Sequence, residues 1–114
     1  MITPAEYNNL RVFAGDVFDL NLNWKDDSGN LFDLSGWHAR LRFFVSKSDR
    51  TTIDELTDGD GITLGDGTTE PNIACHKDDG ETTYAQAPGY FVLEVQEPSG
   101  DWQRLLFGLM KYTA

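Results

Sequence analysis

Two segments in which apolar and polar residues alternate strictly constrain the fold of this chain more than any other feature. Apolar residues occupy every second position in residues 17–24 and again in residues 37–45. Because successive side chains of a strand point to opposite faces, this period predicts two strands that are each buried on one side. The two apolar sets are Phe18, Leu20, Leu22 and Trp24, and Trp37, Ala39, Leu41, Phe43 and Val45.

Turn-forming residues divide the rest of the chain into further short apolar runs. Residues 26–30 (DDSGN) predict a tight reversal after the first strand, and residues 98–101 (PSGD) predict the turn of a hairpin. The runs predict strands at 62–64, 72–76, 90–96 and 102–112, and residues 52–56 predict a short strand or a single turn.

This pattern of about six to eight short strands predicts an all-β fold, namely an antiparallel β-sandwich, with an immunoglobulin-like sandwich or a small barrel as the alternative. A length of 114 residues predicts one domain over residues 1–114. The predicted core contains Phe18, Leu20, Leu22, Trp24, Trp37, Leu41, Phe43, Phe91, Leu93 and Val95.

Hydropathy and net charge argue against two classes of partner, namely membranes and nucleic acids. No apolar run approaches the roughly 20 residues of a membrane-spanning helix, and the first residues lack the basic and apolar regions of a signal peptide. We therefore expect folding in a cytosol and no membrane partner. A net charge of −10 repels a polyanion, so nucleic acid is not an expected partner.

Residue types that support catalysis or metal binding are sparse. Cys75 and His76 are adjacent, and neighbours in a strand point to opposite faces, so they do not form a Cys-His nucleophile. We expect no enzyme and no cofactor. Asp58, Asp60 and Asp66 lie among glycines and are weak calcium candidates, although Ile62 occupies a position where a calcium loop would carry Asp or Asn.

A series of short motifs carries a family resemblance along nearly the whole chain. By the order of these motifs, the chain resembles a family of small phage tail and baseplate modules that includes the N-terminal domain of the lactococcal phage upper baseplate protein. The motifs are residues 14–18 (AGDVF), 24–29 (WKDDSG), 33–37 (DLSGW), 61–64 (GITL), 88–90 (PGY) and 105–108 (LLFG).

The resemblance implies a β-sandwich that attaches receptor-binding or fibre components to a virion. The expected function is therefore a non-enzymatic structural protein, a tail or baseplate adaptor or fibre-attachment subunit, made and folded in the host cytoplasm and located in the virion. Its expected partners are other virion proteins, with a homo-oligomer as a further possibility. A carbohydrate-binding or receptor-binding module using Tyr90, Trp102 and Tyr112 is one alternative, and a capsid decoration protein is another.

Residues 102–112 are apolar in both alternating sets, which a strand buried on one face does not require. We assign Leu105, Phe107 and Leu109 inward. The outer set then forms the predicted partner interface. The alternative is that Gly108 marks a β-bulge, which would turn the residues after it inward. The predicted interface residues are Trp102, Leu106, Met110 and Tyr112.

Overall fold

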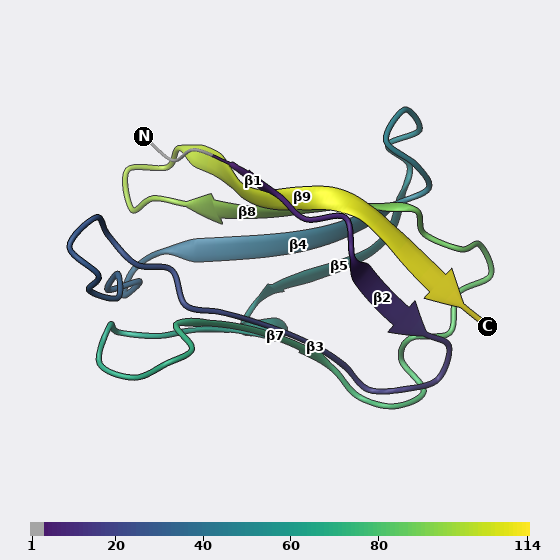
Figure 1. The fold of residues 1–114 in the computed structure, drawn as a ribbon, viewed down its shortest axis with the longest axis horizontal. Coiled ribbons are helices and arrows are strands. Elements are labelled where there is room, and N and C mark those ends of the chain that lie inside the picture. The colour runs from purple at the N-terminus through teal and green to yellow at the C-terminus, as the bar shows by residue number, and fades with distance from the viewer. Residues whose placement is uncertain (1–3) are drawn as a thin grey trace.

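The chain folds into one strongly curled β-sheet that forms a half-barrel (Figure 1). The computed structural model describes residues 4–114, and these residues contain nine strands and no helix. No segment among them is a helix that could cross a membrane. The strands are β1 (Ala5–Glu6), β2 (Leu10–Phe13), β3 (Phe18–Leu22), β4 (His38–Phe44), β5 (Thr52–Asp58), β6 (Gly61–Leu64), β7 (Ile73–Lys77), β8 (Tyr90–Gln96) and β9 (Trp102–Thr113).

Strand pairing in the sheet is mixed. The order is β1-β9-β8-β4-β5-β6-β7-β3, and β2 also pairs with β9. The pairs β1–β9, β2–β9 and β5–β6 are parallel and the others are antiparallel. The all-β prediction and the hairpin formed by β8 and β9 are confirmed. The sheet is not purely antiparallel, because the N-terminal strands run alongside β9 in the same direction.

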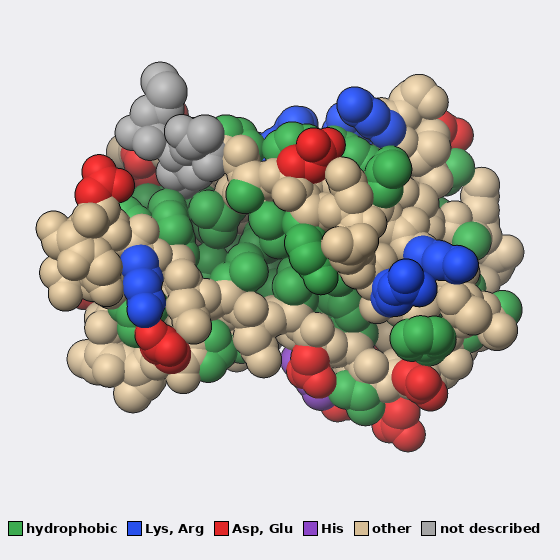
Figure 2. All heavy atoms as spheres, in the orientation of Figure 1, with side chains coloured by type: hydrophobic (Ala, Val, Ile, Leu, Met, Phe, Trp, Pro, Cys, Tyr) green, Lys and Arg blue, Asp and Glu red, His purple; other side chains and the backbone are tan. Residues whose placement is uncertain are grey.

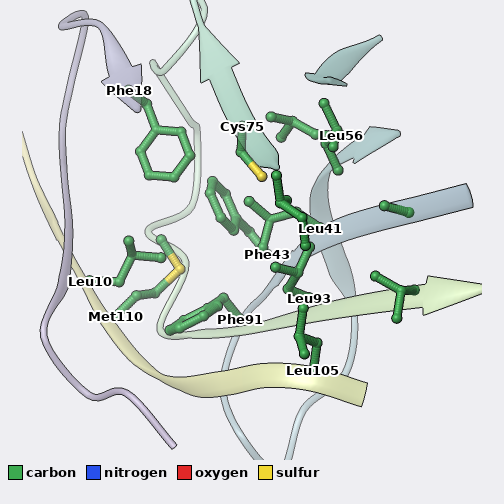
Figure 3. Close-up of a cluster of buried hydrophobic side chains, with 14 of the residues drawn as sticks. Leu10, Phe18, Leu41, Phe43, Leu56, Cys75, Phe91, Leu93, Leu105 and Met110 are labelled. Carbon is green, nitrogen blue, oxygen red and sulfur yellow. The ribbon is translucent and has the colours of Figure 1, made fainter. Parts of the chain in front are cut away.

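The curl brings two layers face to face, with the core between them. In Figure 1, β4, β8 and β9 form the upper layer, and β3 and β7 form the lower one. Phe18 from the lower layer contacts Phe43 from the upper layer edge to face, with ring centroids 5.6 Å apart. Figure 3 shows these rings beside Cys75 and Leu41 in the buried cluster. The alternation of the two sequence segments therefore places opposing apolar faces in contact.

Most of the predicted core is confirmed. Phe18, Leu41, Phe43, Phe91, Leu93 and Val95 are all buried. The other four predicted core residues are only partly buried, although they pack against the cluster; they are Leu20, Leu22, Trp24 and Trp37. Leu22 and Trp24 lie at the open side of the half-barrel, where they line an apolar groove of about 160 Å³ with Leu105 and Leu106. Figure 2 shows this hollow as a hydrophobic patch between the two layers.

The N-terminal segment is held on the outer edge of β9 by an interrupted parallel pairing. Tyr7 N–H donates to the Phe107 carbonyl, and Leu109 N–H donates to the side-chain oxygen of Asn8 (2.8 and 2.9 Å). Between these bonds the backbone of Tyr7 crosses directly over Gly108. A side chain at position 108 would collide with that backbone, so glycine is required here for space.

Candidate docking surface

A β-bulge in β9 determines which of the predicted interface residues face outward. Leu93 pairs with Leu106, but its neighbour Glu94 pairs with Arg104, so Leu105 is an extra residue in β9. Leu105 and Leu106 consequently both pack toward the core. The alternation predicted for this strand is thus reversed from Leu106 onward.

Three of the four predicted interface residues therefore lie on the core side. Met110 is 7% exposed and belongs to the core cluster, while Leu106 and Tyr112 are partly buried against it. Only Trp102 lies outside, with 37% of its surface exposed. The inward assignment of Leu105 is correct, but Phe107 and Leu109 point outward. The alternative prediction of an inward Met110 is correct, although the bulge lies at Leu105 and not at Gly108.

The outer face of β4, β8 and β9 carries a second apolar layer. Phe44, Tyr90 and Val92 are at most 3% exposed although they lie on the face away from the main core. Phe107 of β9 packs against them, which explains why β9 is apolar on both sides. Because these rings lie on an outer face, other side chains must pack over them to shield them from water.

Arginine side chains provide this cover. Arg42 lies 5.3 Å above the Phe44 ring, and Arg50, from the turn between β4 and β5, lies 4.7 Å above the Tyr90 ring. Arg guanidinium groups at such distances are attracted to the ring face and lie flat on it. Two more pairs extend the pattern: Arg104 over Phe107 at 5.2 Å and Arg40 over Trp102 at 4.0 Å. We call the surface formed by these four arginines and their rings the arginine–aromatic face.

A single carboxylate lies at the centre of this face. Glu94 accepts hydrogen bonds from both Arg40 and Arg42, and its side chain is 17% exposed. Desolvation raises the pKa of Glu94, but the hydrogen bonds from the two arginines outweigh it and leave the pKa below its usual value. The Nε atom of Arg42 is buried and has no hydrogen-bond acceptor within residues 4–114. The centre of the face therefore has more donors than acceptors.

Cations continue this surface onto the edge of the sheet. Arg11 of β2 lies directly opposite Lys111 of β9, and both side chains are exposed. In the described part of the chain, neither has a carboxylate partner, and the same holds for Arg50 and Arg104. This is unusual in a chain with 19 acidic and nine basic residues.

Five carboxylate side chains line a recess of about 460 Å³ beside β5, β6 and β7. Lys77 forms an ion pair with Asp54 in it (2.8 Å). The Nδ1 and Nε2 atoms of His76 lie 2.7 Å from Asp19 and 2.8 Å from Asp78. Hydrogen bonds to Asp19 and then to Asp78 raise the pKa of His76. We call this surface the acidic recess; its acidic lining residues are Asp54, Glu55, Asp60, Asp78 and Glu81.

The three calcium candidates have different surroundings in the structure. Asp58 accepts a hydrogen bond from Ala39 N–H (3.0 Å), and Asp66 accepts hydrogen bonds from the backbone and side chain of Thr68. Asp60 lines the acidic recess. Residues 4–114 contain no group of three or more His, Cys, Asp or Glu side chains arranged to hold a metal ion.

Cys75 and His76 point to opposite faces of β7, as predicted. Cys75 is fully buried and lies beside Phe18 and Leu41 in Figure 3, whereas His76 is exposed. Burial raises the pKa of the Cys75 thiol to about 12. The thiolate form, which is the nucleophile, is therefore absent near neutral pH.

Cys75 is expected to react with iodoacetamide at pH 8 only when the protein unfolds. The measurement is the labelling rate across a urea titration, followed by intact mass. Labelling should follow the unfolding transition, and the fully denatured protein is the control for intrinsic reactivity. Rapid labelling of the native protein would contradict this burial.

Sequence reasoning missed the arginine–aromatic face, although part of its signal is visible. Arg40 and Arg42 alternate with the apolar residues of β4, which marks them as outward-facing. Their aromatic partners come from other strands and could not be paired with them from the sequence. No protein-family model matches the chain, and no curated protein matches it. The geometry of this surface therefore carries the functional interpretation.

Proposed function

We propose that this protein is a non-enzymatic structural component of a phage virion, a tail or baseplate adaptor or fibre-attachment subunit that docks to other virion proteins. The arginine–aromatic face supports the docking part of this proposal. The virion context rests on the sequence resemblance to phage tail and baseplate modules. The proposed likeness of this chain to their antiparallel β-sandwich fold rests on the same resemblance.

The physical properties of this face suit protein recognition. Arginine and large aromatic residues dominate the binding energy of protein interfaces, and Arg40 over Trp102 is such a combination. Stacking on a ring already restricts the guanidinium, so less side-chain entropy is lost on binding. The N–H groups at the edge of each guanidinium can still bind a partner carboxylate in a bidentate manner.

A carbohydrate-binding module receives less support from the geometry. Sugar recognition needs accessible aromatic rings, but Tyr90 is 2% exposed and Arg40 covers the ring of Trp102. Tyr112 is half-buried, and its hydroxyl accepts a hydrogen bond from Tyr84 N–H (3.0 Å). A capsid decoration protein would use the same kind of docking surface, and particle fractionation distinguishes it from a tail component.

Replacing Arg50 and Arg104 with glutamate is expected to reduce incorporation of the protein into virions at least tenfold. Reversing charges in a docking surface juxtaposes like charges, and a loss of about 1.4 kcal/mol already corresponds to a tenfold change. The amount of protein per purified particle is measured by quantitative mass spectrometry, with capsid and tail fractions analysed separately.

The matched control is Lys25→Glu, which reverses an exposed cation away from this face. This control should be incorporated normally, and circular dichroism should show that all three proteins are folded at the assay temperature. Absence of the unmodified protein from purified particles would contradict the virion assignment. Normal incorporation of the Arg50→Glu/Arg104→Glu variant would contradict the role of the arginine–aromatic face.

A further inference from the structure

The Lys and Arg residues of the chain are concentrated on one layer of the curled sheet. On the upper layer of Figure 1, the outward-facing side chains include six of the nine Lys and Arg residues of the chain. On the lower layer, the outward-facing residues of β3 and β7 include Asp19 and His76, and the acidic recess lies beside β7. Figure 2 shows Lys and Arg side chains at the top and on the right of the molecule, with some Asp and Glu side chains at the top as well, and Asp, Glu and His side chains along the lower edge. The six cations are Arg11, Arg40, Arg42, Arg50, Arg104 and Lys111.

The two charged surfaces meet at β5. Glu55 lines the acidic recess and lies opposite Arg42 in the β4–β5 pair, and charges are screened over about 8 Å at physiological ionic strength. A partner that approaches the upper layer therefore experiences a cationic surface in spite of the net charge of −10. Repulsion between the net charges of two such molecules is reduced by the same screening.

Several cationic groups of the upper layer lack a carboxylate or other acceptor among the described residues of the single chain. Like charges directly opposite one another destabilise a strand pair, and Arg11 and Lys111 have this arrangement. Arg42 Nε lacks an acceptor, and Arg50 and Arg104 have no carboxylate within the described residues. Each of these groups would gain from a partner that supplies carboxylates.

The chain itself presents a surface of complementary charge beside this face. The acidic recess is concave and contains five carboxylate side chains with Lys77 as its only Lys or Arg. The arginine–aromatic face lies on the convex side of the half-barrel. The charges of the two surfaces are thus complementary, and the surfaces adjoin at Glu55.

The geometry points to a second copy of this chain as the partner of the arginine–aromatic face, with the acidic recess of one copy docked on that face of the next. This inference rests on the proposed function, because it identifies a partner for the same face. Since the two surfaces differ, the contact is heterologous, and copies would stack head to tail into a ring or an open row.

Protein carboxylates fit this face better than nucleic acid does. Single-stranded nucleic acid binds through bases that stack on free aromatic rings. Here the rings of Phe44, Tyr90 and Trp102 already carry guanidinium groups. A nucleic-acid partner would therefore have to displace the arginines from the rings.

Sedimentation velocity at physiological ionic strength tests the inference with two surface variants. The unmodified protein should form oligomers whose size grows with concentration, and 1 M NaCl should weaken their association at least tenfold. Arg50→Ala/Arg104→Ala removes the cationic side and Asp60→Asn/Glu81→Gln removes the acidic side. Each variant should be monomeric alone, while Lys25→Ala should associate like the unmodified protein.

Mixing the two variants is the decisive step. Each retains one intact surface, so the mixture should contain 1:1 dimers and nothing larger. Monomeric unmodified protein at all concentrations would overturn the inference, as would dimers that survive in the acidic-side variant alone. Binding of a labelled oligothymidine that depends on Arg50 and Arg104, without self-association, would instead identify nucleic acid as the partner and overturn it. If self-association fails while virion incorporation still requires Arg50 and Arg104, the proposed function stands and the partner is another protein.

Discussion

Replacing Gly108 with alanine is expected to lower the free energy of unfolding by about 3 to 5 kcal/mol. A Cβ atom at this position would lie 2.6 Å from the Tyr7 carbonyl carbon and 2.8 Å from Asn8 Oδ1, which forces the N-terminal segment away from β9. The cost combines overpacking with exposure of Leu10 and Val12, which are 5% and 2% exposed in the native fold. Urea unfolding measures it, and hydrogen exchange should show lost protection in β2.

Gly80→Ala is the control for this effect. Gly80 has a φ of 85° but no atom within 4 Å of an added Cβ, so only backbone strain of about 1 kcal/mol is expected. The two substitutions thus separate lack of space from conformational strain. A Gly108→Ala protein with unchanged stability and β2 protection would show that the crossing of Tyr7 over β9 is wrong.

Replacing Asn72 with alanine is expected to cost about 2 to 4 kcal/mol of stability. Asn72 is fully buried, and its side chain accepts a hydrogen bond from Trp24 N–H at 2.7 Å. The same amide donates to the carbonyls of Trp24 and Phe32 at 2.8 and 3.2 Å. Alanine would leave two backbone groups of the segment between β3 and β4, Trp24 N–H and the Phe32 carbonyl, without their partner, while the Trp24 carbonyl would keep only its bond from Phe32 N–H.

The matched control is Asn23→Ala, since Asn23 is exposed and its side chain makes one hydrogen bond to Glu70 at 3.2 Å. This change should cost less than about 0.5 kcal/mol. Thermal unfolding compares the two, and tryptophan fluorescence reports the position of Trp24. Equal melting temperatures for the two variants would exclude an anchoring role for Asn72.

The alternation of apolar and polar residues predicted the strands of this fold correctly where the pairing between strands is regular. In β4 and β8 every second residue is buried beneath the other layer, so Leu41, Phe43 and Phe91 were placed correctly. In β9 the same rule failed after Leu105, because one extra residue in a strand reverses the orientation of all that follow. The bulge depends on pairing with β8 and has no local sequence signature.

Segments whose structure depends on distant partners were the least predictable. Residues 52–56 suggested a short strand or one turn, yet β5 extends over seven residues because it pairs with β4 along its length. Strands β1 and β2 contain few alternating residues, and they form only because β9 offers a free edge. The parallel pairing of these two strands, which together with the β5–β6 pair makes the sheet mixed, follows from the same non-local contact.

The candidate docking surface was predicted only at Trp102. Its remaining residues combine side chains of β4, β9 and the turn after β4, and the stacking of Arg50 on Tyr90 joins positions that no periodicity relates. The outward orientation of Arg40 and Arg42 could be read from β4 alone. Their function as a cover for outer aromatic rings required the tertiary structure.

The pairing of β1 and β2 with β9 also affects how the protein is made. Asn8 and Leu109, which are hydrogen-bonded, are 101 positions apart in the sequence. At a translation rate of 5 to 20 residues per second, the N-terminal strands leave the ribosome roughly 5 to 20 seconds before their partner does. During that interval Leu10 and Val12 have no edge to pair with and are available to chaperones. Completion of the sheet consequently waits for the synthesis of β9, and its rate is governed by closure of a long loop and not by formation of local hairpins.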